Sequence, residues 1–422
     1  MNDLPRGRHF IAADRGFATG GGLIARLFAG GFHKLLERID RGIGEGRLQA
    51  TLPDGSVRSF GGRNPGPSAQ IHLHSWRALI RLITSGSVGW YKAWEMGEWS
   101  SADPVAIFEI FARNGTSLGN TARAKGLFRL VNRIAHRVRD NDKEGSRRNI
   151  AFHYDLGNDF YSAWLDPGMT YSSAVFAEPI AAEEDLEAAQ VRKIEFLLGR
   201  LDLQPGDHLL EIGCGWGSLI EVAARDHQAR VTGLTLSEEQ KVYADQRLDK
   251  AGLAERCEIQ LTDYRDVEGQ FDAIASVEMV EAVGQDYWPS YLATISRMLK
   301  PGGRAGLQLI SIREDLFDDY AANADFIQTY VFPGGMLISE RRFAEIAEGI
   351  GLEWRDRSSY RLHYAETLKR WRQRYELAVD EGRLPADFDE RFNHLWRYYL
   401  MYCEGGFRGG SIDVVQVTLV RR

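Results

Sequence analysis

Cysteine is scarce in this sequence, and the few that occur lie far apart. Among 422 residues there are three, Cys214, Cys257 and Cys403, and their spacing matches no zinc-binding pattern. A small odd number of scattered cysteines is typical of a protein from a reducing compartment, not of one held together by disulfides. The sequence therefore predicts a cytoplasmic protein, and we expect it to hold no metal.

Long apolar runs are also missing. No stretch of about 18 apolar residues occurs, so no membrane-spanning helix is predicted. The first residues, Met1–Arg6, lead into a mixed polar stretch without the apolar core of a signal peptide. The net charge of −7 argues against nucleic acid as a partner of the chain as a whole. A lipid substrate would have to be reached from the cytoplasmic face of the membrane.

The composition is otherwise that of a large globular protein. Hydrophobic residues make up 44% and charged residues 26% of the chain, and 422 residues predict two domains. The residue pattern over 1–120 predicts a small α+β domain. Its expected elements are a helix over 22–39, a hairpin around Asp54-Gly55, a strand over 69–74, and helices at Trp76–Ser85 and Pro104–Ala112. We expect the strand histidines His72 and His74 to be solvated or hydrogen-bonded.

Basic residues gather after this segment. Residues 121–150 hold nine Lys and Arg against three acids, and five apolar residues recur at helical spacing from Leu127 to Val138. The pattern predicts a basic amphipathic helix and a polar linker over 121–149. Two interpretations stay open: the helix lies on an anionic membrane surface, or it packs on the protein with a solvated basic face.

Strands and helices alternate from residue 208 to residue 310. The predicted strands are His208–Ile212, Arg230–Leu234, Glu258–Leu261, Phe271–Ser276 and Gly303–Ile310, and the predicted helices are Leu219–His227, Glu238–Ala251 and Trp288–Leu299. Such alternation is typical of an α/β, doubly wound, mostly parallel sheet, whose ligands bind at the carboxyl ends of the strands. Beyond it we expect an irregular aromatic lid at Asp325–Gly335, helices at Ala365–Val379 and Phe388–Tyr402, and an edge strand at Ile412–Val420.

The turn after the first of these strands carries three alternating glycines. Residues Leu209–Ser218 read Leu-Leu-Glu-Ile-Gly-Cys-Gly-Trp-Gly-Ser. Glycines at this spacing let a backbone pass close to a ligand and let helix and strand pack tightly. With the acid before the first glycine, the stretch resembles the first motif of class I methyltransferases, which bind S-adenosylmethionine (SAM). A tight turn without a ligand is the alternative.

Further motifs make a more specific resemblance. They lie, in order, at 153–161 (His-Tyr-Asp-Leu-Gly-Asn-Asp-Phe-Tyr), 165–174, 210–217, 233–240, 278–284, 330–335 and 407–416. With them the chain resembles the cyclopropane-fatty-acyl-phospholipid synthase family, SAM-dependent enzymes that modify the double bond of unsaturated acyl chains. The resemblance implies a class I methyltransferase domain over 150–422. Segment 1–120 is similar to the family's smaller lipid-associated domain.

The resemblance assigns ten residues to SAM. They are Tyr171 and Ser172 at the methionyl carboxylate, Gly213, Gly215 and Gly217 under the cofactor, Thr235 and Gln240 at the ribose, and Tyr264, Asp263 and Arg265 at the adenine. It also implies a chemistry. The alkene attacks the sulfonium methyl group, a carbocation forms in a water-excluding aromatic pocket, and a base removes a proton so that a ring closes.

In the family this base is a bound bicarbonate, and the resemblance carries its contacts to Glu281, Tyr364 and the backbone of Ile310. Three positions depart from the best-known bacterial members. Ser173 stands where they have Cys, Gln308 where they have a bicarbonate-binding His, and Ala282 where they have another His. Gln308 can donate a hydrogen bond but cannot carry charge, which puts the fate of the cation in question.

We therefore expect a cyclopropane product and keep a methyl-branched chain as the alternative. A small-molecule methyltransferase of the same fold and a non-catalytic SAM-binding protein are the other hypotheses. The resemblance implies that the substrate is a membrane phospholipid with an unsaturated acyl chain. It also implies that the enzyme binds peripherally to the membrane surface as a homodimer.

Overall fold

The structure is a computed structural model that describes residues 32–119, 156–323 and 325–422. The predicted basic helix and linker over 121–149, the first part of the helix expected over 22–39, and residues 153–155 of the first family motif lie outside the described residues. Among the described helices, none combines the length and the apolar character that crossing a bilayer requires.

The chain divides into two compact units, each assembled from separate stretches of sequence. Unit 1 comprises Met1–Asp140, Arg313–Pro333 and Ala386–Ile412, and unit 2 comprises Asn141–Ile312, Gly334–Pro385 and Asp413–Arg422. The boundaries expected from the sequence, 1–120 and 150–422, are consecutive instead. They differ because two later segments pack with the N-terminal residues.

Unit 1 contains a four-stranded sheet in the order β2-β1-β3-β4. Its strands are β1 (Glu45–Thr51), β2 (Val57–Gly61), β3 (Asn64–Leu73) and β4 (Trp99–Ser100). The pair β1–β2 is antiparallel around Asp54-Gly55, as predicted, and β1–β3 is parallel. The helices are α3 (Phe32–Gly42), α4 (Arg77–Glu95), α5 (Pro104–Arg113), α6 (Gly115–Leu118), α14 (Glu314–Ala321), α15 (Phe326–Tyr330) and α18 (Glu390–Gly409).

Two glycines explain why α18 packs in unit 1. A Cβ atom at Gly405 would lie 2.3 Å from the Cβ of Phe108 on α5, and one at Gly409 would lie 2.4 Å from the Cβ of Ala112. The two helix backbones therefore approach more closely than a residue with a side chain at position 405 or 409 would allow. This contact joins a late segment of the chain, α18, to an early one, α5.

The expectation of an irregular segment at 325–335 is wrong for its first half. Phe326–Tyr330 form the short helix α15, because Asp325 and Gln328 satisfy its first backbone groups as a capping box. The rings of Phe326 and Tyr330 lie 5.0 and 4.6 Å from the ring of Tyr91. The aromatic residues that suggested a lid thus build the core of unit 1.

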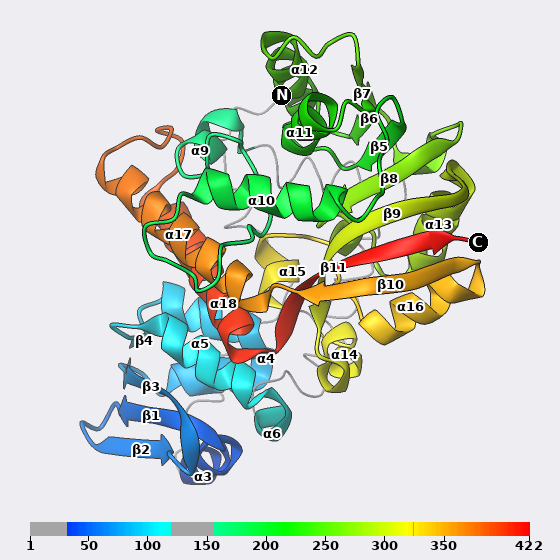
Figure 1. Cartoon of the computed structure of the whole chain (residues 1–422). Coiled ribbons are helices and arrows are strands. Elements are labelled where there is room, and N and C mark those ends of the chain that lie inside the picture. Colours follow the sequence, from blue (N-terminus) through cyan, green and yellow to red (C-terminus); the bar gives the residue numbers. More distant parts are fainter. Residues whose placement is uncertain (1–31, 120–155, 324) are drawn as a thin grey trace. The chain divides into compact units, whose positions relative to one another are not determined.

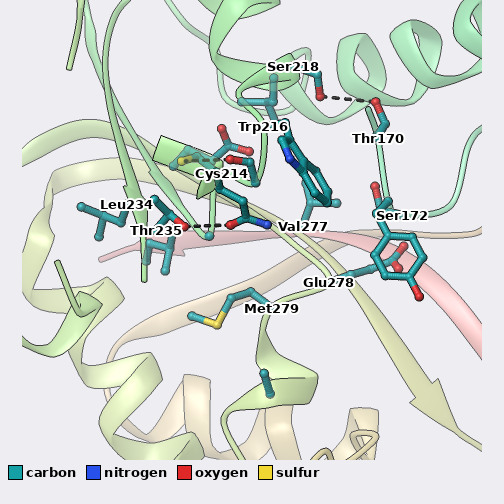
Figure 2. A pocket seen from close by; sticks show the side chains of 18 of the residues that line it. Thr170, Ser172, Cys214, Trp216, Ser218, Leu234, Thr235, Val277, Glu278 and Met279 are labelled. Atoms are coloured by element: carbon teal, nitrogen blue, oxygen red, sulfur yellow. Dashed lines mark hydrogen bonds between the residues drawn. The ribbon is translucent and has the colours of Figure 1, made fainter. Parts of the chain in front are cut away.

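Unit 2 contains a seven-stranded, mostly parallel sheet in the order β10-β11-β9-β8-β5-β6-β7 (Figure 1). Its strands are β5 (His208–Ile212), β6 (Arg230–Thr235), β7 (Cys257–Leu261), β8 (Phe271–Val277), β9 (Leu299–Ile312), β10 (Leu352–Ser359) and β11 (Ile412–Arg421). The helices are α9 (Asn158–Ser162), α10 (Leu186–Leu198), α11 (Ser218–Asp226), α12 (Glu238–Lys250), α13 (Trp288–Met298), α16 (Glu340–Gly349) and α17 (Arg361–Asp380). The predicted doubly wound α/β sheet is confirmed. A pocket lies at the carboxyl ends of β5, β6 and β8 (Figure 2).

One edge of this sheet differs from the prediction. The last strand, β11, lies between β10 and β9 and is not at the edge. The edge strand β10 escaped prediction because three charged residues, Arg355, Asp356 and Arg357, are exposed in its middle and interrupt the alternation of apolar residues. β10 pairs antiparallel with β11.

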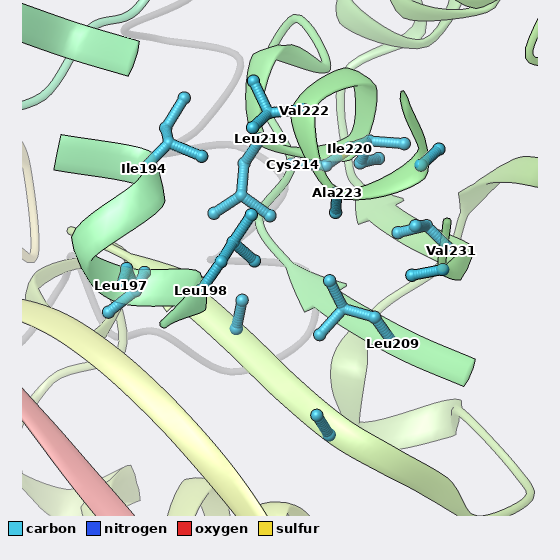
Figure 3. Packing of buried hydrophobic residues seen from close by; sticks show 14 of the residues in the cluster. Ile194, Leu197, Leu198, Leu209, Cys214, Leu219, Ile220, Val222, Ala223 and Val231 are labelled. Atoms are coloured by element: carbon cyan, nitrogen blue, oxygen red, sulfur yellow. The ribbon is translucent and has the colours of Figure 1, made fainter. Parts of the chain in front are cut away.

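A core of aliphatic side chains fixes the strands that carry the pocket. Leu197 of α10 and Ile220 of α11 pack with Leu209 of β5 and Val231 of β6, all of them almost fully buried (Figure 3). Burying one such side chain contributes about 1.5–3 kcal/mol. The carboxyl ends of β5 and β6 are thus held in place by their neighbouring helices.

Candidate active site

The pocket in unit 2 is lined mainly by residues at and just beyond the carboxyl ends of β5, β6, β7 and β8. Its wall contains the segments 169–172, 193–194, 211–216, 218–219, 234–236, 262–264, 277–279 and 282–283, with Gln240 (Figure 2). Eight of the ten residues assigned to SAM line it: Tyr171, Ser172, Gly213, Gly215, Thr235, Gln240, Asp263 and Tyr264. Gly217 and Arg265 lie behind this wall.

The glycine turn forms one side of the pocket. Gly213, Gly215 and Gly217 have φ angles of 82°, 53° and 86°, in the left-handed region that favours glycine. The N–H groups of Gly213 and Cys214 both donate to the Leu234 carbonyl, at 3.0 and 2.8 Å. A Cβ at Gly215 would meet no atom within 4 Å, whereas one at Gly217 would lie 3.1 Å from the Cβ of Ala244. Gly215 therefore leaves space for a ligand, and Gly217 allows close packing of α11 against α12.

A buried lysine joins the wall beside Ser172, which the resemblance assigns to the methionyl carboxylate. The Nζ of Lys193, on α10, donates to the Oγ of Ser172 at 2.7 Å. Burial lowers the pKa of Lys193 to about 8, opposed by the nearby carboxylates of Glu278, Asp166 and Glu211. Sequence reasoning missed this residue. The signal was present in the sequence, because a lysine interrupts the apolar face of α10.

Two polar features mark the wall near the residues that the resemblance assigns to the ribose. The Thr235 hydroxyl donates to the Oε1 of Gln240 at 2.8 Å, which fixes the glutamine side chain. Glu211, at the end of β5, is buried, and its Oε2 has no hydrogen-bond partner among the described residues. Burial raises the pKa of Glu211 to about 8. A buried carboxyl oxygen on a pocket wall is the kind of group that a polar ligand satisfies, so these residues fit SAM.

Asp263 and Arg265, which the resemblance assigns to the adenine, form a closed pair. The Nε and Nη2 atoms of Arg265 donate to the two carboxylate oxygens of Asp263 at 2.8 and 2.7 Å. This hydrogen bonding raises the pKa of Arg265. Tyr264 lines the pocket with its ring edge-on to Tyr291, at 5.3 Å, and burial raises its pKa to about 12. Arg265 therefore orients Asp263 from behind the wall.

The residues predicted to be catalytic are Ser173, Glu281, Gln308, Ile310 and Tyr364. None of these five lines this pocket, but Glu278 does and connects three of them. Its Oε1 accepts from the backbone N–H of Ser173 and from the Nε2 of Gln308, both at 2.8 Å. Its Oε2 accepts from the Tyr364 hydroxyl at 2.6 Å. The structure thus gathers Ser173, Gln308 and Tyr364 around a carboxylate that sequence reasoning did not single out.

The other two predicted residues pair with each other. The backbone N–H of Ile310 donates to the Oε1 of Glu281. The Oε2 of Glu281 is buried and has no hydrogen-bond partner within the described residues. Burial, reinforced by the carboxylate of Glu278, raises the pKa of Glu281 to about 8. Glu281 is therefore largely protonated at neutral pH.

These contacts decide whether the site fits a bicarbonate ion. The donors that the resemblance assigned to bicarbonate are the side chains of Gln308 and Tyr364 and the backbone N–H of Ile310. Each of them already donates to a glutamate of this chain. Of the assigned groups, only the Oε2 of Glu281 has no hydrogen-bond partner within the described residues. With the three assigned donors engaged within the chain, the residues present do not fit bicarbonate as an additional group.

The signal that could have revealed Glu278 lies in its backbone. Its φ angle is 49°, a conformation that non-glycine residues rarely adopt and that gathers at functional sites. The sequence shows only an acid three residues before Glu281. Nothing in that spacing indicates a left-handed residue whose carboxylate accepts hydrogen bonds from three separate segments.

The fold and this pocket define a class I SAM-dependent methyltransferase. The chain belongs to the mycolic acid cyclopropane synthetase family, whose model matches residues 141–417. It is 41% identical to the tuberculostearic acid methyltransferase UfaA1 of Mycobacterium tuberculosis, over 83% of each chain. It is 33% identical to the cyclopropane-fatty-acyl-phospholipid synthase of Escherichia coli, over 85% of this chain and 89% of that one.

Solved structures agree with this assignment. Mycolic acid cyclopropane synthase CmaA1, complexed with S-adenosylhomocysteine (SAH) and CTAB, is 30% identical and covers 65% of this chain, with a TM-score of 0.60. That match covers 98% of the CmaA1 chain. The protein is thus a SAM-dependent methyltransferase of a family that acts on lipids.

Proposed function

We propose that this enzyme transfers the methyl group of SAM to the double bond of an unsaturated acyl chain in a membrane phospholipid, and that the product is a cyclopropane acyl chain. The observation that carries the proposal is the carboxylate of Glu278 on the wall of the SAM pocket, held by Tyr364. A methyltransferase that acts on a heteroatom needs no such acceptor for a carbon-bound proton. An enzyme that methylates an alkene does, because the cation it forms must lose one.

Each part of the pocket has a proposed role in this reaction. Bound SAM supplies an electrophilic methyl group to the alkene and leaves as SAH. Gly215 makes room for it and Gly213 leaves space for the Met279 side chain beside it, while Ser172 and Lys193 offer polar atoms to its methionyl carboxylate. Thr235 and Gln240 face the ribose, and Asp263 and Tyr264 the adenine.

A methyl-branched product is the second candidate. The observation that favours it is the 41% identity with a tuberculostearic acid methyltransferase, since tuberculostearic acid is a methyl-branched fatty acid. Both products begin with the same methyl transfer. They differ in what happens to the cation afterwards.

We further propose that the enzyme works at the cytoplasmic face of the membrane, as a peripheral protein and a homodimer. The scattered cysteines support a reducing compartment, and the basic pattern over 121–149 suits an anionic lipid surface. The segment 1–120 would associate with lipid and 150–422 would catalyse.

Mass spectrometry of the lipids from a host rich in monounsaturated phospholipid tests the proposal. We expect acyl chains heavier by one CH₂ group in cells that express the enzyme. A Gly213→Val variant serves as the control that should lack the product, because its side chain would collide with Met279 on the wall of the SAM pocket. Hydrogenation separates the products, since a methylated alkene takes up hydrogen and a ring under mild conditions does not. Unchanged acyl chains would refute the proposal.

A further inference from the structure

We propose that the carboxylate of Glu278 is the general base that takes the proton from the transferred methyl group, in the place that the family resemblance gives to bicarbonate. This inference rests on the proposed function and names a catalytic residue for it. Glu278 lines the SAM pocket, so the proposed base belongs to the wall that the cofactor would contact.

The first argument is the number of hydrogen bonds that converge on this side chain. The backbone N–H of Ser173, the amide of Gln308 and the phenol of Tyr364 all donate to it, at 2.6–2.8 Å. Three donors from three separate segments form a nest for one anion. The anion that these donors hold is the carboxylate of Glu278, which is part of the chain itself.

The second argument is that this arrangement is fixed. The backbone N–H of Glu278 donates to the Gln308 carbonyl at 2.7 Å. The Oε1 of Gln308 accepts from the Nε2 of Gln416 at 3.0 Å, which orients the Gln308 amide with its NH₂ group toward Glu278. Gln416 in turn donates to the Lys193 carbonyl at 3.1 Å. This orientation also explains how a glutamine serves where other members have histidine.

The third argument concerns charge. The titratable groups that face Glu278 are Lys193, Glu281 and Tyr364. Glu281 has only one backbone donor and an unpaired oxygen, so it holds a proton, whereas Glu278 has three donors and the attraction of Lys193. The negative charge of this pair therefore resides on Glu278. Burial raises the pKa of Glu278, which makes its carboxylate a stronger base than an exposed glutamate.

The proposed step balances as follows. After methyl transfer the lipid carries a new C–CH₃ bond and a positive charge on the neighbouring carbon. An oxygen of Glu278 accepts one proton of that methyl group, and the two electrons of the broken C–H bond form the third bond of the ring. The products are a cyclopropane and a neutral Glu278, which returns its proton to solvent. No further reactant is required.

The test measures how activity depends on bicarbonate. The full-length enzyme is assayed for SAH release and for lipid product, with vesicles of monounsaturated phospholipid, in carbon dioxide-free buffer with and without added bicarbonate. We expect the wild-type rate to be the same in both. A wild-type rate that falls without bicarbonate and returns with it would overturn the inference.

Two substitutions sharpen this test. Glu278→Gln keeps the shape but not the basicity, and should lower the rate by about 10²–10⁴-fold without rescue by bicarbonate. Glu278→Gly empties the nest and suits the positive φ angle, so added bicarbonate should restore the rate by about tenfold or more. Near-wild-type activity of Glu278→Gln would also overturn the inference. Asp356→Gly is the matched control, an exposed acid with a φ angle of 53°.

Two more readouts separate the explanations. Calorimetric binding of SAH by Glu278→Gln should match the wild type, which shows that the pocket has folded. A wild-type enzyme that binds SAH but yields no lipid product with any unsaturated vesicle would refute the proposed function, and the inference with it. An active wild-type enzyme with an equally active Glu278→Gln variant would refute the base assignment alone.

Discussion

Replacing Glu281 by glutamine should stabilise the protein at neutral pH and have little effect at acidic pH. Burial raises the pKa of Glu281 from 4.5 to about 8, and one of its oxygens has no partner among the described residues. Between these two pKa values the folded protein keeps this proton and the unfolded chain loses it. The free energy of unfolding therefore falls as pH rises through this window, by about 1.4 kcal/mol per pH unit.

The size of the effect follows from the pKa difference. At pH 7 the free energy of unfolding of the wild type is about 3 kcal/mol lower than it would be with a side chain that does not titrate. At pH 5 it is lower by about 1 kcal/mol. Glutamine can still accept from the Ile310 N–H with its carbonyl oxygen. The stability advantage of Glu281→Gln should therefore grow from about 1 to about 3 kcal/mol between these pH values.

Urea unfolding followed by tryptophan fluorescence measures this advantage at each pH. Glu255→Gln, at an exposed position of the same unit, controls for the loss of one acid. A stability difference that does not change with pH would show that Glu281 is ionised in the folded protein. A variant less stable than the wild type at pH 7 would refute the reasoning outright.

Three further predictions concern single contacts. Tyr364→Phe removes the hydroxyl that donates to Glu278 at 2.6 Å, so it should lower the rate and move the acidic limb of the pH–rate profile to higher pH, as initial rates across pH will show. Gly213→Ala should weaken SAM binding in calorimetry and destabilise the fold by about 1–2 kcal/mol, because φ is 82° and the new Cβ would lie 2.8 Å from the Met279 side chain. Gly405→Ala should lower stability to heat by about 1–3 kcal/mol, since its Cβ would lie 2.3 Å from a side-chain atom of α5. Unaltered melting of Gly405→Ala would contradict the close packing of α5 and α18.

The sequence predicted the central sheet well because its signals there are local. Strand β5 has the predicted bounds, and β6, β7 and β8 differ by one residue at an end. Buried parallel strands appear in the sequence as apolar runs between helices. The glycine turn also indicates where β5 ends and α11 begins. The cofactor residues follow from the same local signals, since most of them lie in the turns that end these strands.

What escaped prediction depends on contacts between distant residues. The charged sequence of β10 forms a strand only because β11 pairs with it. Segments 313–333 and 386–412 belong to unit 1 because of packing such as that of Gly405 on α5. Glu278 became a site residue because Ser173, Gln308 and Tyr364, from three separate segments, all donate to it. No periodic pattern in the sequence indicates that these three segments meet at Glu278.

The fate of the methyl hydrogens tests the central claim most directly. Purified enzyme is given SAM with a fully deuterated methyl group and vesicles of monounsaturated phospholipid, and the acyl products are analysed by mass spectrometry. If the new methyl group loses a proton to a base in the pocket, the product will carry two of its three deuterium atoms. A product that keeps all three, or an acyl chain with none, would contradict the account.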